Sequence, residues 1–478
     1  MMTTGTRSHS PVHGTAGAGA EPRRHGAAVG ELRASLRLAL PVISVQLGIM
    51  LMGTIDTAML GRVSAAALAS AAIAHSVSIT LLMFGASILS ALDPLVSQSF
   101  GAGDRRATGG HLQRGLVLAL ALAVPLSLLM VDLGPLLRAL GEPPVVVAGA
   151  TLYIRLLVAG NLPFLLFHVL RQSLQAMSIV RPALYAIAAG NLVNALANYA
   201  LIFGHWGCPR LGAPGSACAT AAARWAMFLW LLLAARRPLR ENVEGLSGRR
   251  RLGSVWQRTG GWRPMARMLR IGLPIGLHMA AEMLLFVAIA LLMGRFGTEA
   301  IAGHQVALLL CAVSFMVPVG IAGAAMTRVG NAIGRADLSA ARRTAAVCLG
   351  LGAGVMSLFA ALFALAPRQL AALFTTDPAV IAGAAALLPI AAAFQVFDGT
   401  QVVSAGILRG TADTALPAVG AVLGYWLLGL PAGCLLAFRG GLGPRGLWWG
   451  ATVGLGIVAV LLVARIVYRF RGDIARAG

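Results

Sequence analysis

Four acidic side chains fall inside long apolar stretches of this sequence, where a charge is expensive. They are Asp56, Asp93, Glu282 and Asp398. A charged side chain at the centre of a bilayer costs roughly 2.5–3.5 kcal/mol on insertion scales, so four of them cost roughly 10 kcal/mol. Acids at this depth are usually kept because they bind something, and a proton, Na⁺ or an organic cation would suit a buried carboxyl.

Each acid also has a structural interpretation, in which the carboxyl stays neutral or pairs with an Arg of a neighbouring helix. This interpretation is strongest for Asp93, which stands next to Pro94, a residue that kinks helices. Its partner would be Arg171 or Arg328. For the other three acids the functional interpretation is favoured.

Glu282 and Asp398 form the pair with the clearest chemistry. Glu282 lies near the middle of the apolar run 269–293, and Asp398 lies near the middle of a later run in the same half of the chain. Two carboxylates that share a dry site cannot both stay ionised cheaply, so one should hold a proton until a cation arrives. We therefore predict that Glu282 and Asp398 face each other and couple the binding of two cations. If the coupling ion is Na⁺ rather than H⁺, both would be metal ligands, and no other cofactor is expected.

Amide side chains form a second group of candidates. Asn191, Asn194 and Asn198 fall at positions i, i+3 and i+7, which places them on one face of a helix. They could coordinate a cation, hydrogen-bond a carboxyl, or simply join two helices. We predict a polar pocket in which Asp56 contacts Asn191 or Asn194.

The composition requires a membrane protein. The chain has 478 residues, of which 58% are hydrophobic and 11% charged, and its mean hydropathy is +0.81. All 38 basic residues are Arg, and the net charge is +22. The five cysteines are scattered without metal-ligand spacing, and no nucleophile–base pair or cofactor loop indicates an enzyme.

Twelve apolar runs reach the length of about 20 residues that a helix needs to cross a bilayer. They divide six and six around one long Arg-rich segment. We expect an all-α protein with a disordered cytoplasmic tail over 1–33, an N-terminal lobe over 34–235, a linker over 236–268, a C-terminal lobe over 269–468 and a short tail over 469–478.

The distribution of Arg predicts the orientation. With the N-terminus in the cytoplasm, the inner segments hold 27 Arg and the outer loops hold seven. This excess predicts that the chain lies in a bacterial inner membrane, with both termini and the linker on the cytoplasmic side. The linker then faces lipid headgroups, and nucleic acid is excluded as a partner.

The two halves repeat at one constant offset. Leu40-Pro41 matches Leu273-Pro274, Gly101 matches Gly334, and Asp104 matches Asp337. Because each half has an even number of spans, the halves share one orientation and should be related by a pseudo-two-fold axis along the membrane normal. Parallel repeats of this kind are a transporter design, with sites near the midplane between the lobes.

Several segments resemble the multidrug and toxic compound extrusion (MATE) transporters, closest to their NorM-like branch. The resemblance covers about residues 35–468 in the right order and is carried by LALPV, GTIDTAMLGRVS, LVSQSFGAGD, GLPIGLHMAAE, GHQVAL, FDGTQVVSAGILRGTADT, GYWLLGLPAG and GLWWGATVG. It implies twelve helices in two lobes, a central cavity, and efflux of organic cations in exchange for Na⁺ or H⁺ by a single chain in the lipid bilayer.

The resemblance also assigns residues. Asp56, Glu282 and Asp398 match the acids of the first, seventh and tenth helices, and the latter two match cation-coupling residues. We take all three as cation-coupling candidates. Candidates for the cavity wall are Asn191, Asn194, Phe394, Gln305 and Asp93. Phe394 replaces a Tyr of some NorM-like members, which favours H⁺ over Na⁺ as the coupling ion. The alternative is a flippase for lipid-linked sugars from the same superfamily, whose anionic cargo would favour a cavity lined with Arg.

Overall fold

The computed structural model describes residues 21–139, 141, 143–244 and 261–477. Within these ranges the chain forms helices and turns and contains no β-strand. Twelve helical spans are long and apolar enough to cross a membrane. The predicted all-α architecture with twelve spans is confirmed. The expectations for residues 1–20 and for most of the Arg-rich linker, 245–260, lie outside the described residues.

The first six spans form the N-terminal lobe. They are built from α1 (Glu21–Leu60), α2 (Ala65–Leu89), α3 (Leu92–Gly101), α4 (Arg105–Val131), α5 (Gly134–Ala139), α6 (Pro144–Leu157), η1 (Val158–Gly160), α7 (Asn161–Ala176), α8 (Arg181–Phe203) and α9 (Ala213–Asn242).

The last six spans form the C-terminal lobe. They are built from α11 (Trp262–Met293), η2 (Gly294–Phe296), α12 (Thr298–Gly334), α13 (Leu338–Leu365), α14 (Pro367–Ala372), α15 (Pro378–Gly410), α16 (Ala415–Ala421), η3 (Val422–Gly429), α17 (Leu430–Cys434), η4 (Leu435–Arg439) and α18 (Pro444–Arg469).

Matching turns begin the third span of each lobe. The Asp104 carboxylate accepts a hydrogen bond from the Ala107 amide at 2.8 Å, and the Asp337 carboxylate accepts one from the Ala340 amide at 2.9 Å. Each Asp therefore caps the helix that follows it. The backbone hydrogen bond to Asp337, together with the Ser339 hydroxyl, lowers the pKa of its carboxyl. The equivalence of Asp104 and Asp337 predicted from the sequence thus reflects one local structure used twice.

The second span is broken between α2 and α3. Pro94 has no N–H with which to continue the helical hydrogen-bond ladder, and the Asp93 amide instead bonds to the Ser90 carbonyl at 3.0 Å. The break places Asp93 in the first turn of α3. Its carboxyl is therefore held at a point where the helix changes course.

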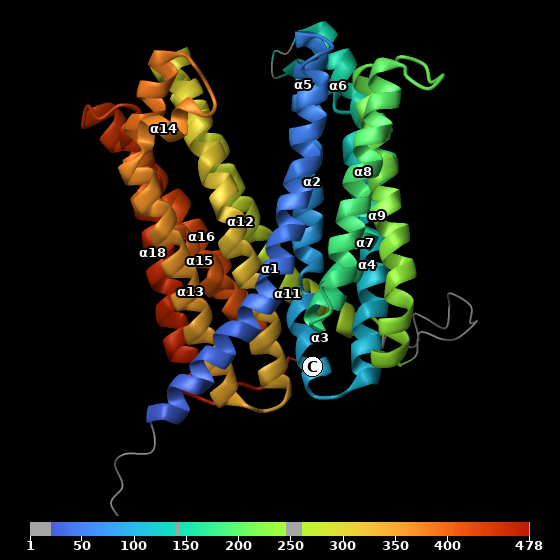
Figure 1. Cartoon of the computed structure of the whole chain (residues 1–478), viewed down its shortest axis with the longest axis vertical. Coiled ribbons are helices and arrows are strands. Elements are labelled where there is room, and N and C mark those ends of the chain that lie inside the picture. Colours follow the sequence, from blue (N-terminus) through green and yellow to red (C-terminus); the bar gives the residue numbers. More distant parts are fainter. Residues whose placement is uncertain (1–20, 140, 142, 245–260, 478) are drawn as a thin grey trace, which may run out of the picture.

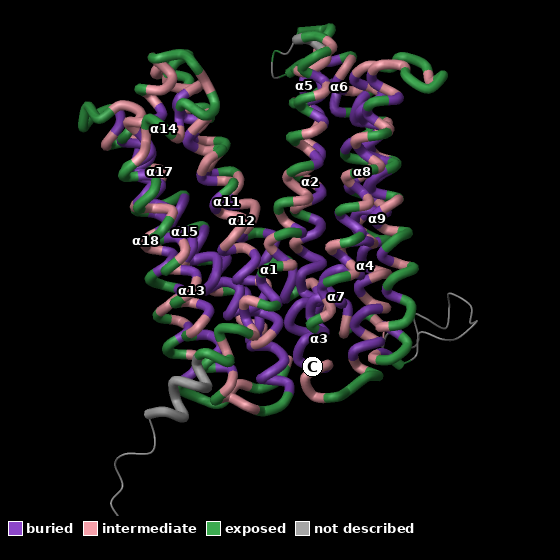
Figure 2. Tube along the Cα trace, viewed as in Figure 1, coloured by how far each residue is buried: buried purple, intermediate pink, exposed green. Residues whose placement is uncertain are grey.

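The two lobes stand side by side and meet at one end only. In Figure 1 they diverge toward α5 and α14, and they converge around α3, near the C-terminus. The buried part of the chain is concentrated at the converging end in Figure 2. Gly101 packs against the backbone of Asn331, and Gly334 packs against the carbonyl of Gln98. The repeat in the sequence relates these two contacts, so the closed end obeys the predicted pseudo-two-fold symmetry.

The long helices α1 and α11 each pack on both lobes. Residues Leu38 to Val42 of α1 belong to the hydrophobic core of the C-terminal lobe, whereas Val45 and Met52 belong to the core of the N-terminal lobe. The matching helix α11 does the reverse, with Met265 to Ile275 in the N-terminal core. Each of these helices therefore belongs to one lobe at its beginning and to the other lobe farther along. The predicted lobes, 34–235 and 269–468, assigned each helix to a single lobe.

The start of α1 corrects one expectation. A disordered tail was predicted over 1–33, but α1 already begins at Glu21. The Glu31 carboxylate accepts hydrogen bonds from Arg328 and from the Thr344 hydroxyl, each at 2.6 Å. These contacts attach α1 at Glu31 to the C-terminal lobe.

Candidate functional site

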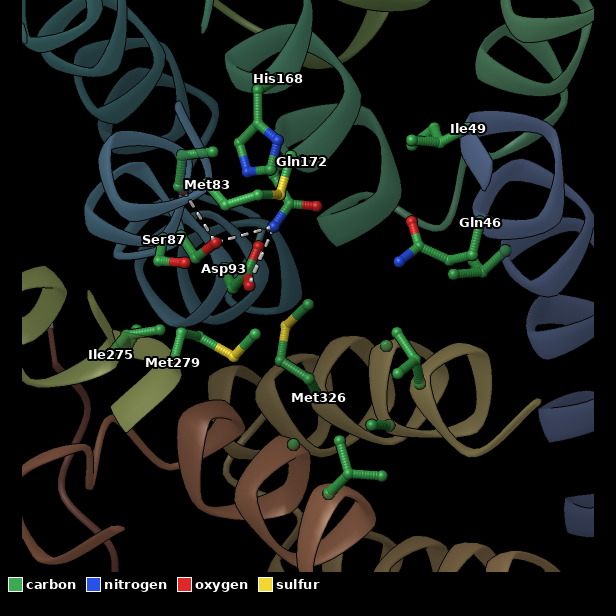
Figure 3. Close-up of a pocket in the computed structure, with 18 of the residues that line it drawn as sticks. Gln46, Ile49, Met83, Ser87, Asp93, His168, Gln172, Ile275, Met279 and Met326 are labelled. Atoms are coloured by element: carbon green, nitrogen blue, oxygen red, sulfur yellow. Dashed lines mark hydrogen bonds between the residues drawn. The ribbon is translucent and has the colours of Figure 1, made fainter. Parts of the chain in front are cut away.

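A cavity of about 350 Å³ lies between the two lobes. Helices α1, α2, α3 and α7 supply one wall, and α11, α12 and α15 supply the other. Much of the wall is apolar, with Met and Phe side chains from both lobes. Figure 3 shows Met83, Met279 and Met326 around the same space as Asp93 and Gln172. The polar residues of the wall are Gln46, Ser87, Ser90, Asp93, His168, Arg171, Gln172, Gln175, His278, Glu282 and Arg409.

Asp93 is the acid of the N-terminal wall. Its carboxylate accepts a hydrogen bond from the Gln172 side chain at 3.2 Å, and the same amide donates to the Ser90 hydroxyl at 3.2 Å (Figure 3). The predicted pairing with Arg328 is wrong, because Arg328 binds Glu31 instead. Arg171 interacts with Asp93 electrostatically without forming a direct ion pair. Asp93 therefore faces the cavity with only an amide bound to it.

Glu282 is the acid of the C-terminal wall. Gln401 on α15 donates to its carboxylate at 3.3 Å, and the His278 ring nitrogen lies 3.7 Å from the same oxygen. His278 stands one helical turn before Glu282 and also lines the cavity. It was not predicted from the sequence, although its i, i+4 spacing from Glu282 was a usable signal.

Asp398 lies behind this wall, with only 4% of its surface exposed, and it does not line the cavity. It stands one turn before Gln401 on α15 and interacts electrostatically with Glu282. Its Oδ1 atom has no hydrogen-bond partner among the described residues. The two carboxyl groups thus lie in one region of the C-terminal lobe, with Glu282 at the cavity wall and Asp398 behind it. That they face each other remains a prediction.

Asp56 occupies a separate polar pocket within the N-terminal lobe. Its Oδ1 accepts hydrogen bonds from Asn194 at 3.0 Å and from Asn198 at 2.6 Å, and its Oδ2 accepts one from the Thr220 hydroxyl at 2.8 Å. The predicted contact between Asp56 and Asn194 is present. Asn191 instead donates to the Gly48 carbonyl at 2.9 Å, where it joins α8 to α1. This pocket does not open into the wall of the central cavity.

Four of the five predicted wall residues do not line the cavity: Asn191 and Asn194 on α8, and Gln305 and Phe394 in the C-terminal lobe. Gln305 is exposed, while its neighbour His304 is buried and accepts a hydrogen bond from the Trp448 indole at 3.2 Å. Phe394 is buried within the C-terminal lobe, with its ring centroid 6.0 Å from that of Phe286. Neither Gln305 nor Phe394 lines the cavity.

Most of the polar wall was not predicted from the sequence. His168, Arg171, Gln172 and Gln175 fall at i, i+3, i+4 and i+7 on α7, a polar stripe in an otherwise apolar span. That spacing was a usable signal for an inward face. Arg409 also lines the cavity, because α15 continues to Gly410.

Metal ligands are sparse in the part of the chain that the structure describes. No group of three or more His, Cys, Asp or Glu side chains there could hold a metal ion. A Na⁺ ion would therefore have to combine the predicted ligands Glu282 and Asp398 with neutral oxygen atoms, such as those of amides or hydroxyls.

Two parallel lobes of six spans with a polar cavity at their interface define a transporter fold. The MatE family model matches residues 41–200 and again residues 274–435. The two matches begin at Pro41 and Pro274, which are equivalent positions of the repeat found in the sequence. The chain belongs to the MatE family and is a multi-pass membrane protein. Members of this family are transporters and not enzymes.

Relatives extend over nearly the whole chain. The probable multidrug resistance protein NorM of Bradyrhizobium diazoefficiens is 38% identical, over 90% of this chain and 92% of its own. The multidrug resistance protein PmpM of Pseudomonas aeruginosa is 36% identical, over 91% of each chain.

Solved structures confirm the fold. The eukaryotic MATE transporter AtDTX14 superposes with a TM-score of 0.82 and 24% identity, covering 92% of this chain and 96% of its own. The outward-facing conformation of a multidrug resistance MATE family transporter superposes with a TM-score of 0.83 and 17% identity, with the same coverage.

Proposed function

We propose that this protein is a multidrug efflux antiporter, which exports organic cations in exchange for H⁺ or Na⁺ by alternating access between its two lobes. The observation that carries the proposal is the pair of buried acids in the C-terminal lobe, one at the cavity wall and one behind it. The names of the relatives, which are multidrug resistance proteins, support the cargo class. One chain holds both lobes and the cavity between them, so a monomer suffices.

The cavity suits flexible recognition of apolar cations. Its Met side chains can adapt to cargo of different shapes, because Met is unbranched and polarisable. Asp93 and Glu282 provide negative charge on opposite walls. Arg171 and Arg409 lie in the same cavity, so a cationic cargo has to be placed against the acids and away from the guanidinium groups.

Asp56 is more fully hydrogen-bonded than Glu282 or Asp398. Asp56 accepts three hydrogen bonds, from two amides and a hydroxyl, which satisfies a carboxylate that acts only as an acceptor. Glu282 accepts one long hydrogen bond, and Asp398 has an oxygen without a partner among the described residues. A cation is therefore more easily added to the Glu282 and Asp398 pair, and we assign the coupling to this pair.

Exchange follows if the ion and the cargo compete. An ion that enters from outside and binds at Glu282 and Asp398 removes negative charge from the cavity wall, which weakens the binding of a cationic cargo. The gradient can drive the cycle only if the ion binds the two lobe arrangements unequally. One elementary charge that moves inward down 100 mV supplies about 2.3 kcal/mol, and the export of a monovalent cation cancels this electrical term.

The side on which the cavity opens depends on the orientation of the chain. With both termini in the cytoplasm, as the Arg distribution predicts, the converging end of the lobes is cytoplasmic and the diverging end faces outward. This arrangement corresponds to an outward-facing state. We favour H⁺ as the coupling ion, because Phe394 offers no hydroxyl oxygen to a Na⁺ ion and its ring packs against Phe286.

The flippase alternative gains one observation, since Arg171 and Arg409 both line the cavity. Asp93 and Glu282 offset these two charges, and a wall with balanced charge is a poor receptor for a pyrophosphate.

Everted membrane vesicles test the proposed exchange. They should accumulate a fluorescent organic cation when an acidic lumen is imposed, or when the lumen is loaded with Na⁺, and vesicles without the protein should not. Equal accumulation with and without both gradients would overturn the antiport mechanism.

A further inference from the structure

A second cavity, of about 1060 Å³, lies at the converging end of the lobes. It is lined by α1, by the turn that joins α7 to α8, and by one residue of α12. Four arginines surround it, Arg33 and Arg37 from α1, Arg181 from α8 and Arg328 from α12. We refer to this cavity, defined by these four residues, as the basic groove. It shares no lining residue with the central cavity.

The described residues leave part of the positive charge of the basic groove without an ion pair. Arg328 is already bound to Glu31 at 2.6 Å. Arg33, Arg37 and Arg181 are exposed, and no hydrogen bond or ion pair joins their side chains to other described residues. Three guanidinium groups from two helices thus surround one space. Their planar donor forks match the oxygen atoms of a phosphate.

The remainder of the groove is apolar. The groove is lined by Leu36, Leu40, Pro41 and Ile179, and 58% of the surface of Leu40 is exposed. A free phosphate has no apolar group that could contact this surface, whereas the acyl chains of a phospholipid can cover it. The combination of guanidinium groups and apolar side chains therefore fits an amphiphilic anion.

The arginines of the groove stand near the beginnings of two candidate spans, where a span meets the headgroup layer. Arg181 is the first residue of the fifth span, and Arg33 and Arg37 lie in the first turns of a span that begins at Val29. Basic residues at this depth meet the anionic surface of a membrane.

We propose that the basic groove is a binding site for one anionic phospholipid, whose phosphate is held by Arg37, Arg181 and Arg33 and whose acyl chains lie along Leu36 and Leu40. The lipid would bridge the inner half of α1, which packs on the C-terminal lobe, and the start of α8 in the N-terminal lobe. It is a ligand distinct from the cargo, and its binding requires no transport.

The test measures binding of a fluorescent phosphatidylglycerol to the purified, delipidated full chain. The variant R37Q/R181Q should bind this lipid at least tenfold more weakly than the wild type. The control R106Q/R335Q removes the same charge from exposed positions outside the groove and should bind as the wild type does. The variant R33Q/R37Q provides a second removal of charge, and size-exclusion profiles and thermal melts establish that each variant is folded.

Competition identifies the ligand. Unlabelled phosphatidylglycerol should displace the probe, while phosphatidylcholine and millimolar inorganic phosphate should not. Equal affinity in the wild type, both groove variants and the control would overturn the site. Displacement by phosphatidylcholine, or by inorganic phosphate alone, would overturn its assignment to an anionic phospholipid.

Discussion

Gly101 and Gly334 face each other across the interface between the lobes, and a methyl group on Gly334 would lie 2.9 Å from the Gly101 Cα. The same methyl group would overlap the Gln98 carbonyl oxygen, while one on Gly101 would overlap the backbone of Asn331. Backbone atoms cannot move aside as a flexible side chain can. The closed end of the molecule therefore depends on the absence of a side chain at two symmetry-related positions.

We predict that G334A shifts the protein away from the state described here. The added methyl should separate the lobes at the closed end and bring them together at the diverging end. Spin labels at Leu136 and Leu373, which are exposed on the two lobes at that end, should report a shorter distance. The control is G354A, because Gly354 has no heavy atom within 4 Å of an added methyl. Identical distance distributions in the two variants would contradict the prediction.

A second prediction concerns the coupling pair. Glu282→Gln and Asp398→Asn should each leave the protein folded and inserted, because a neutral amide is cheaper to bury than a charged acid. Each should nevertheless abolish gradient-driven efflux of a fluorescent organic cation, measured in vesicles with matched protein levels. Glu299→Gln is the matched control, since Glu299 is an exposed acid of the same lobe. Wild-type rates in both site variants would exclude these acids from coupling.

The pocket around Asp56 allows a prediction about stability. Asn198→Ala removes the shortest hydrogen bond to the buried carboxylate and should lower the thermal stability, with a loss of about 1–3 kcal/mol. Combining it with Asp56→Asn should lose less than the sum of the single effects, because the two side chains act as one unit. Thermal melts of the two single variants, the double variant and the wild type complete the cycle. Additive losses would show that the two residues contribute independently.

The acidic and basic residues of the central cavity should have opposite effects on the KM for a cationic cargo. Asp93→Asn removes an attraction for a cationic cargo and should raise the KM several-fold, whereas Arg409→Gln removes a repulsion and should lower it. An uncharged cargo of similar size should respond much less to either change. Efflux kinetics with both cargoes provide the measurement. A parallel change of KM in the two variants would mean that cavity charge does not select the cargo.

The sequence predicted the architecture well because its main signals are local. The length of the apolar runs determined the spans, and the constant offset between the two repeats predicted the parallel lobes. The contact between Asp56 and Asn194 was predictable because both are polar groups in one lobe and need partners away from lipid.

It was harder to predict which side chains of each helix point toward the cavity or the protein interior. Lipid tails are as apolar as the packed interior, so hydrophobic periodicity does not reveal which side of a helix points inward. Gln305 was therefore predicted to line the cavity, whereas the neighbouring His304 is the residue that is buried. The packing of α1 and α11 on both lobes depends on contacts between distant parts of the chain, so no local sequence pattern predicts it.

The crossing of α1 and α11 bears on how such a chain could arise. Each half of the chain places the beginning of its first long helix in the core of the other half. A protein made of one half alone would expose that apolar segment and leave the matching site on its own core empty. Two identical copies could fill these sites reciprocally, in the manner of domain-swapped dimers. Joining two such exchanging subunits end to end would give the arrangement of the present chain, with the Arg-rich segment at the junction.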